Sequence, residues 1–134
     1  MYLLDTNVVS ELRRPRPNLG VLDWIQQVPP EKLYLSGVTI GEIQAGIEIT
    51  REQDTAKAAD LERWLDQVLA TYRVLPQDGP VFREWARLMH RKSDTLTTDA
   101  LIAATAVVHR LSVVTRNVRD FEPFGVPTLD PFRQ

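Results

Sequence analysis

The chain has 134 residues and a mass of 15.3 kDa, a length typical of one domain. It is 43% hydrophobic and 25% charged, which is ordinary for a globular protein and excludes a disordered or collagen-like chain. The net charge of −2 excludes a strongly cationic nucleic-acid-binding coat, and the lack of cysteine excludes disulfides, thiolate nucleophiles, iron–sulfur clusters and cysteine-bound zinc.

Short apolar runs alternate with helical patterns in the first half of the chain. The expected elements are a strand over 2–4, helices over 8–14 and 18–28, a strand over 33–35 and a helix over 39–52. Pairs of prolines follow each of the first two helices and end them. The third helix carries Ile40, Ile43 and Ile47 on one face, and Gly46 beside this stripe is expected to allow close packing.

The second half continues the same alternation. The expected elements are an amphipathic helix over 58–69, a strand over 73–75, a helix over 80–89, a helix over 99–110, a strand over 111–115, a loop over 116–124 and a last apolar segment over 126–129. The 99–110 helix is apolar nearly all round and is therefore expected to be buried. Short apolar strands between helices predict an α/β fold with a parallel sheet covered on both faces.

Four acidic residues stand where open parallel sheets bind ligands, beyond the carboxyl ends of the strands. Asp5 ends the first strand, and Glu42 lies in the first turn of the helix that follows the second strand. Asp120 lies just past the strand that ends at Thr115. Asp99 opens the buried helix, so its position at the same edge is an inference from the fold.

Each acid alone has an ordinary structural explanation. Asp5 can cap a helix, Glu42 and Asp99 can complement helix dipoles, and Asp120 can be a solvated loop residue. Together, three or four carboxylates at one edge repel one another unless they are protonated or bind a cation. Oxygen ligands without Cys or His suit Mg²⁺ or Mn²⁺, and one or two such ions support hydrolysis of a phosphodiester bond by a metal-activated water.

Other catalytic patterns are missing from the sequence. It contains no Gly-rich phosphate loop, no dinucleotide-binding glycine pattern and no Gly-x-Ser-x-Gly elbow. The two histidines, His90 and His109, are expected to be structural or solvated, which disfavours a nuclease that uses paired histidines. We expect neither a signal peptide nor a membrane segment, since no stretch approaches the roughly 18 apolar residues that a bilayer requires.

Four segments resemble PIN-domain proteins, and most closely the VapC-type toxins of type II toxin–antitoxin systems, including the FitB-like subgroup. They are LLDTNVVSE at 3–11, TIGEI at 39–43, TDALIAATA at 98–106 and TRNVRDF at 115–121. The segments occur in the family's order and span nearly the whole chain. The resemblance implies a single PIN domain over 1–134, a three-layer α/β/α sandwich with a short parallel sheet.

The resemblance also implies an activity and a set of partners. It suggests a Mg²⁺-dependent endoribonuclease toxin, for which Mn²⁺ can substitute, that acts on RNA in the cytoplasm as a homodimer. A cognate antitoxin would hold it inactive by inserting a segment near the acidic pocket. Operator DNA would be bound only through the antitoxin, and no membrane is involved.

The family's site residues are carried over one by one. The catalytic carboxylates become Asp5, Glu42, Asp99 and Asp120, of which Asp5 and Asp99 are the expected direct metal ligands. The other two would bind metal through water, occupy a second metal site or orient the nucleophile. The pocket-ordering residues become Thr6, Asn7, Thr115 and Asn117. Because many relatives carry an acid at position 117, whether Asp120 or Asn117 completes the site stays open.

Arginine near this edge offers candidate phosphate contacts. Arg116 and Arg119 are preferred because they bracket Asn117 and adjoin Asp120. A solvated surface explains each arginine equally well, as it does the more distant Arg13, Arg14 and Arg16. The aromatic residues Phe82, Trp64 and Trp85 follow helical stripes and are expected in the core or a dimer interface rather than as base-stacking platforms.

Two other functions remain open from the sequence. The chain could act mainly within a toxin–antitoxin complex that binds operator DNA, with little nuclease activity of its own. A phosphotransfer enzyme of the haloacid-dehalogenase type also begins with an Asp after its first strand. That family requires Asp-x-Asp, however, and position 7 is Asn.

Overall fold

The computed structural model describes residues 1–133 and contains one five-stranded sheet. The strands are β1 (Tyr2–Leu4), β2 (Leu33–Ser36), β3 (Arg73–Leu75), β4 (Ser112–Val114) and β5 (Thr128–Leu129). All neighbours are parallel, in the order β3-β2-β1-β4-β5. The chain therefore adds strands outward from β1 in one direction and then returns to the other side of β1. This reversal makes the carboxyl ends of β1 and β4 the switch point of the sheet.

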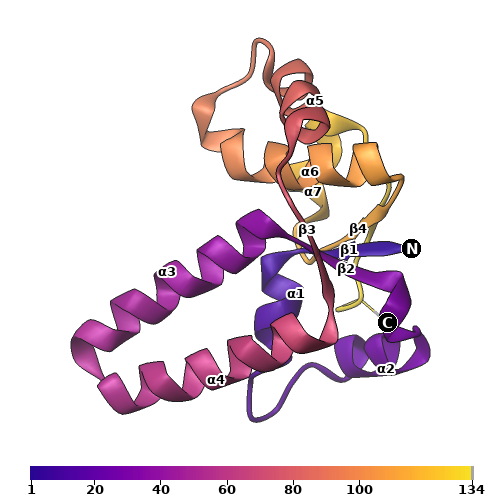
Figure 1. Cartoon of the computed structure of the whole chain (residues 1–134). Coiled ribbons are helices and arrows are strands. Elements are labelled where there is room, and N and C mark those ends of the chain that lie inside the picture. Colours follow the sequence, from indigo (N-terminus) through magenta and orange to yellow (C-terminus); the bar gives the residue numbers. More distant parts are fainter. Residues whose placement is uncertain (134) are drawn as a thin grey trace.

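Helices cover both faces of the sheet (Figure 1). One layer contains α1 (Thr6–Glu11), α2 (Leu19–Gln27), α3 (Gly37–Gln53) and α4 (Thr55–Thr71), and α3 and α4 extend away from the sheet as a pair. The other layer contains α5 (Gly79–Met89), α6 (Thr97–His109) and α7 (Val118–Phe121). Three 3-10 turns connect these elements, at Pro30–Lys32, Asp94–Leu96 and Glu122–Phe124. The predicted three-layer α/β fold is confirmed.

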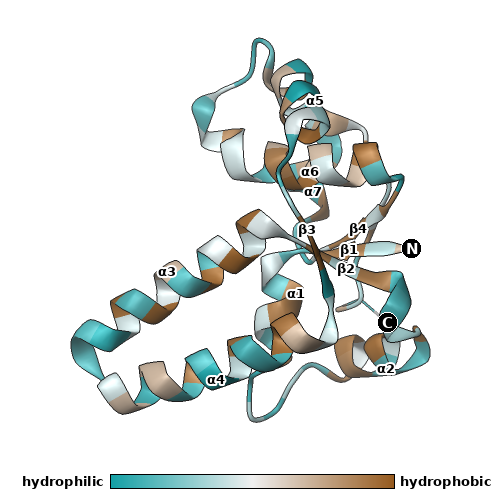
Figure 2. Cartoon of the chain, in the orientation of Figure 1, coloured by the Kyte–Doolittle hydropathy of each residue, from teal (hydrophilic) through white to brown (hydrophobic). Residues whose placement is uncertain are grey.

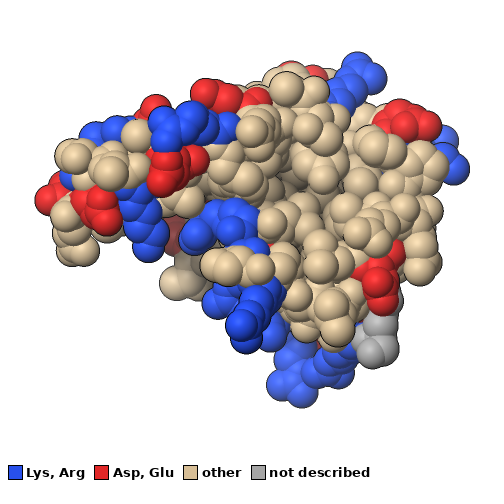
Figure 3. Space-filling model, turned by 90° about the horizontal axis from the view of Figure 1, so that it is seen from below, with Lys and Arg blue, Asp and Glu red and all other residues tan. Residues whose placement is uncertain are grey.

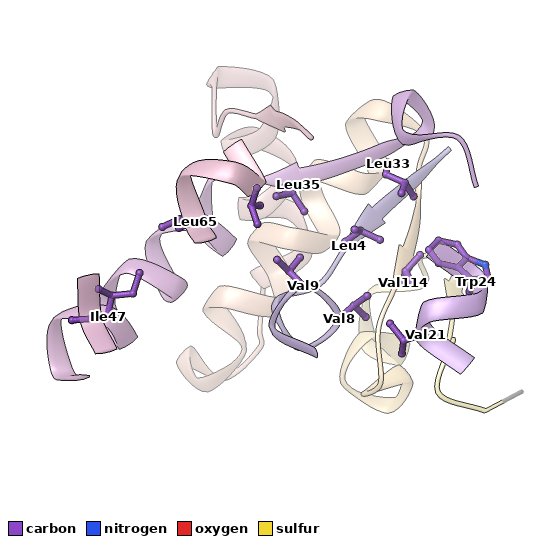
Figure 4. Close-up of a cluster of buried hydrophobic side chains, with 12 residues drawn as sticks. Leu4, Val8, Val9, Val21, Trp24, Leu33, Leu35, Ile47, Leu65 and Val114 are labelled. Carbon is purple, nitrogen blue, oxygen red and sulfur yellow. The ribbon is translucent and has the colours of Figure 1, made fainter. Parts of the chain in front are cut away.

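Alternation along the strands divides the apolar side chains between two cores. Leu4 and Val114 belong to the core beneath α1 to α4, whereas Leu3 and Val113 belong to the core beneath α5 to α7. Successive strand residues point to opposite faces, so a strand with helices on both sides reads as a continuous apolar run. Figure 4 shows the first core, and Figure 2 shows the apolar residues concentrated in the strands and in α6.

Several helix boundaries and one loop differ from the sequence-based expectation. The first helix spans Thr6–Glu11 rather than 8–14, because Asp5 caps it directly after β1. Helix α3 begins at Gly37, so Glu42 lies in its second turn rather than its first. The expected loop over 116–124 contains α7 and a 3-10 turn, which are too short to show helical periodicity in a sequence.

Two predictions about packing have different outcomes. Helix α6 is buried or half-buried at every position except Val107, which is 40% exposed, so the expected burial is largely confirmed. Gly46 was expected to allow a close contact, and this is wrong: a Cβ atom added there would meet nothing within 4 Å. Within residues 1–133, no helix combines the length and apolar character needed to cross a bilayer.

Candidate active site

Asp5 stands at the switch point because of the pairing between β1 and β4. Its backbone N–H donates to the carbonyl of Val114 at 2.9 Å, which extends the ladder by one residue beyond the strand. Its side chain is only 7% exposed, and Oδ1 accepts a hydrogen bond from the backbone N–H of Thr6 at 2.8 Å. Asp5 is thus the N-cap of α1, as its ordinary structural explanation required, and it also faces the crevice at the carboxyl ends of the strands.

A hydrogen-bond network joins Asp5 to the loop after β4. Asp5 Oδ2 accepts from the Thr115 hydroxyl at 2.8 Å and from Asn7 Nδ2 at 3.1 Å. Asn7 Oδ1 in turn accepts from the backbone N–H of Arg116 at 3.0 Å. The backbone N–H of Asn117 donates to the Thr115 hydroxyl at 3.0 Å, and the described structure gives the Asn117 side chain no hydrogen bond. Two of these bonds, from Thr115 to Asp5 and from Arg116 to Asn7, connect residues more than 100 positions apart, and the network holds the Asp5 carboxylate in one orientation.

Glu42 reaches the same region from α3. Its Oε1 atom accepts a hydrogen bond from the Thr6 hydroxyl at 2.7 Å. Thr6 directly follows Asp5 in the chain. The Thr6 hydroxyl also lies 3.3 Å from the hydroxyl of the fully buried Thr39. The sequence analysis missed Thr39, although its position three residues before Glu42 places both on one face of the helix.

Asp99 and Asp120 come from the opposite helical layer. Asp99 lies in the first turn of α6 and is half-buried, while Asp120 lies in α7 and is exposed. The four acids therefore form a gradient from the buried Asp5, through Asp99, to the exposed Glu42 and Asp120. None of the four pairs with a lysine, arginine or histidine within residues 1–133, so neither Arg116 nor Arg119 neutralises them.

The electrostatics show that the four acids influence one another. Burial raises the pKa of Asp99 from its ordinary 3.8 to about 6, and the charges of Asp5, Asp120 and Glu42 contribute to the same increase. Burial also raises the pKa of the Asp5 carboxyl, an effect that the hydrogen bonds from Thr115, Thr6 and Asn7 partly reverse. Repulsion of this kind favours the binding of either protons or a cation.

The donor set fits a hard divalent ion that keeps much of its water. Over residues 1–133, no three Asp, Glu or His side chains are close enough together to enclose a metal ion as direct ligands. Mg²⁺ does not require such an enclosure, because it is usually held by one or two carboxylates and retains several waters. Asp5 and Asp99 could supply two carboxylates at the inner end of the site, with Glu42 and Asp120 at its outer end.

A groove of about 680 Å³ adjoins the acids on the side of α7, and we call it the C-terminal groove. It is lined by Arg116, Asn117, Val118, Arg119, Asp120, Glu122, Asp130 and Arg133. Its three arginines are exposed, as are Arg13, Arg14 and Arg16 after α1. Figure 3, viewed from below the orientation of Figure 1, shows basic side chains gathered in the middle and lower part of that face.

The remaining candidate residues lie elsewhere. Trp64 and Trp85 pack against the two cores, and Phe82 is 47% exposed with its ring edge-on to Trp85. His90 is exposed at the end of α5. His109 ends α6 and lies beside Met1 and Leu111, which directly precede β1 and β4. It is therefore at the amino ends of the strands, the opposite edge of the sheet from the acids.

The fold and the acidic crevice define a PIN-domain protein. The PIN-domain family model matches residues 2–124, and the chain belongs to this family. The chain is 37% identical to VapC ribonuclease Y4jK from Sinorhizobium fredii, with 98% of each chain covered. It is 34% identical to Toxin FitB from Neisseria gonorrhoeae, with 98% of this chain and 99% of the relative covered.

Solved structures show the same similarity over the whole chain. The crystal structure of FitAcB from Neisseria gonorrhoeae has a TM-score of 0.89 and 35% sequence identity, with 100% of both chains covered. The structure of FitAB bound to an IR36 DNA fragment has a TM-score of 0.87 and 34% identity, with 100% of this chain and 97% of the other covered. The resemblance predicted from the four sequence segments is therefore confirmed.

Proposed function

We propose that this chain is the ribonuclease toxin of a toxin–antitoxin pair, which hydrolyses RNA phosphodiester bonds with a water activated by a divalent metal ion. The relatives support this proposal, since one is named a VapC ribonuclease and another a toxin, and both match almost the whole chain. PIN-domain ribonucleases are metal-dependent, and the hard oxygen donors of this site favour Mg²⁺, with Mn²⁺ as a substitute.

The observation that carries the proposal is a group of four carboxylates, from the N-cap of α1 and from α3, α6 and α7, in which the charges of the other three act on Asp99 and none forms an ion pair within residues 1–133. Apart from the cap that Asp5 provides for α1 and the bond that Glu42 accepts from Thr6, grouping these acids opposes folding, because each adds repulsion to the others. The group is also unsuited to hold a phosphodiester by itself, since both are anionic. A divalent cation between the acids and the substrate resolves both difficulties.

The proposed roles of the acids follow from their burial. Asp5 and Asp99 bind the ion directly, because they are the least solvated members of the group. Glu42 and Asp120 face solvent, so they hold and orient waters or complete a second ion site. Bound there, Mg²⁺ supplies a water of lowered pKa and neutralises charge on the phosphoryl oxygens. Thr6, Asn7 and Thr115 keep Asp5 and Glu42 in place through the bonds described above.

The proposal is tested with purified protein and a labelled single-stranded RNA. Asp5→Asn and Asp99→Asn are each expected to lower cleavage at least about a hundredfold, because loss of a direct metal ligand removes most of the ion's contribution. Asp66→Asn, an exposed acid on α4, is the matched control and is expected to cleave normally. Excess EDTA is expected to stop cleavage by the wild type, and Mg²⁺ or Mn²⁺ to restore it.

The reaction products provide an independent test. Attack by a metal-activated water leaves a 5′-phosphate and a 3′-hydroxyl, whereas attack by the ribose 2′-hydroxyl leaves a 2′,3′-cyclic phosphate. Full cleavage in EDTA, full activity of both Asn variants, or a cyclic phosphate product would each contradict the proposal.

The partners are part of the same proposal. We propose that the chain is a single PIN domain over 1–134 that forms a homodimer and acts in the cytoplasm, where an antitoxin blocks the acidic pocket. The FitAB structure with DNA favours a second candidate function, in which the complex binds operator DNA through the antitoxin. Co-expression with the neighbouring gene product distinguishes the two: a complex that binds operator DNA, together with a free chain that cleaves no RNA in Mg²⁺ or Mn²⁺, supports the second function alone.

A further inference from the structure

The C-terminal groove extends the acidic site toward the end of the chain. Helix α7 contributes Arg119 and Asp120 to its lining, and the segment after β5 contributes Asp130 and Arg133. Asp120 belongs to both the groove and the acid group, since its charge helps to raise the pKa of Asp99. The groove is therefore continuous with the acid group at Asp120, and its lining carries both arginines and acids.

Arg116 stands at the junction of the groove and the acids and is held at two points. Its backbone N–H donates to Asn7 Oδ1 at 3.0 Å, and Asn7 also donates to the Asp5 carboxylate. Its guanidinium lies over the ring of Phe132, 4.5 Å from the ring centroid. Its guanidinium forms no ion pair or hydrogen bond with any side chain in residues 1–133, so its five N–H donors remain available.

Phe132 is itself fixed in place by the fold. Its ring packs against the core beneath α1 to α4, and its backbone N–H donates to Asp130 Oδ1 at 2.9 Å. Pro131, between these two residues, is buried. The ring is therefore a rigid surface, and a guanidinium stacked on it loses much of the motion that an exposed arginine side chain ordinarily has.

We propose that Phe132 is a positioning residue, which holds the Arg116 guanidinium on the groove wall so that it binds the RNA phosphate next to the scissile one. This inference rests on the proposed ribonuclease function. A guanidinium binds phosphate through two parallel N–H···O bonds, and this geometry requires a defined orientation of its plane. Stacking on Phe132 provides that orientation before the substrate arrives, which reduces the ordering cost of binding. Arg119, which forms no ion pair within residues 1–133, extends the contact to a further phosphate, whereas Arg133 pairs with Asp130 at 3.5 Å.

Binding of a fluorescein-labelled single-stranded RNA, measured by anisotropy, tests the proposal. All variants carry Asp5→Asn, so that the RNA stays intact. Arg116→Ala is expected to bind the RNA about tenfold more weakly. The slope of log Kd against log salt concentration is expected to be shallower by about 0.7, because one phosphate contact is lost. Phe132→Leu keeps an apolar side chain but loses the aromatic face, and is expected to bind about threefold more weakly. Phe132→Tyr restores the face and is expected to bind like the parent.

The double variant and a control separate positioning from general weakening. If Phe132 acts through Arg116, Arg116→Ala combined with Phe132→Leu binds no more weakly than Arg116→Ala alone. Arg83→Ala, an exposed arginine of α5 outside the groove, is expected to bind like the parent. In the background that retains Asp5, Phe132→Leu is expected to raise KM about threefold and leave kcat unchanged.

The outcomes distinguish this inference from the proposed function. The positioning role is overturned if Phe132→Leu has the same Tm as its parent and binds RNA equally well. It is also overturned if the double variant loses as much affinity as the product of the two single losses. Arg116→Ala leaves the ring intact, so its unchanged affinity would overturn the phosphate contact even if Phe132→Leu failed to fold. A wild-type chain that binds RNA through Arg116 but never cleaves it overturns the proposed function and leaves the contact in place.

Discussion

Asp99→Asn offers the sharpest test of the cost of ionising Asp99, which burial and the charges of the neighbouring acids together impose. The substitution keeps the size of the side chain, and the described structure gives the Asp99 carboxylate no hydrogen bond or ion pair that would be lost. A pKa of about 6 instead of 3.8 means that the folded state favours the protonated form of Asp99. The folded protein is therefore penalised by ionisation of this group as the pH rises from about 4 to above 6, and the penalty is absent below pH 4.

The magnitude follows from the pKa difference and the exposure of Asp99. A difference of about 2 in pKa corresponds to about 3 kcal/mol in a fully desolvated site. Asp99 is only half-buried, and solvent screening reduces this to about 1 kcal/mol. In EDTA at pH 7.5, Asp99→Asn is expected to be more stable than the wild type by that amount, which raises Tm by about 4 °C. At pH 3.5 the two proteins are expected to differ little.

Thermal and urea unfolding followed by circular dichroism measure these differences, with Asp66→Asn as the control for an exposed helical acid. Addition of Mg²⁺ is expected to reverse the order, because the ion stabilises the wild type by binding its folded state and binds the variant more weakly. A variant that is less stable than the wild type in EDTA at pH 7.5, or that gains equally at pH 3.5, would show that the cost of ionising Asp99 is not the cause.

Substitutions at three further positions test the fold. Gly46→Ala is expected to raise the free energy of unfolding by about 1 kcal/mol in urea titrations, because the space around Gly46 is open and alanine favours the helix; a loss of stability would mean that the site is closed. Arg110→Gly is expected to raise the free energy of unfolding by about 0.5–1 kcal/mol, because Arg110 ends α6 with a φ of 57°, where only glycine is free of strain. Lower stability of the variant in the same urea titration would refute this reason. Glu11→Ala is expected to lower the free energy of unfolding by about 1–3 kcal/mol, because it removes the buried acceptor of the Asn18 N–H at 2.9 Å. Glu11→Gln keeps an acceptor and is expected to be closer in stability to the wild type. Equal loss of stability in both variants would indicate that the charge matters and the acceptor does not.

Local patterns explain which parts of the fold could be predicted from the sequence. The five strands appear where short apolar runs were expected, because a strand covered on both faces is largely apolar. Helices α3 to α6 have enough turns for their periodicity to be visible, and proline and cap residues mark their ends. Helix α7 has only four residues, so its sequence could not be distinguished from that of a loop.

The positions of the four acids along the chain also marked them as candidate site residues, since each follows a strand or lies near the start of a helix. The sequence by itself therefore determined the fold class and the strands, which depend on neighbours within a few positions, and it predicted the acidic residues of the candidate site. The tertiary structure alone decided the strand order, the burial gradient from Asp5 to Asp120, the bond from Arg116 to Asn7 and the stacking of Arg116 on Phe132. These features depend on pairing between β1 and β4, whose residues lie about 110 positions apart, and no local periodicity encodes which distant strands become neighbours.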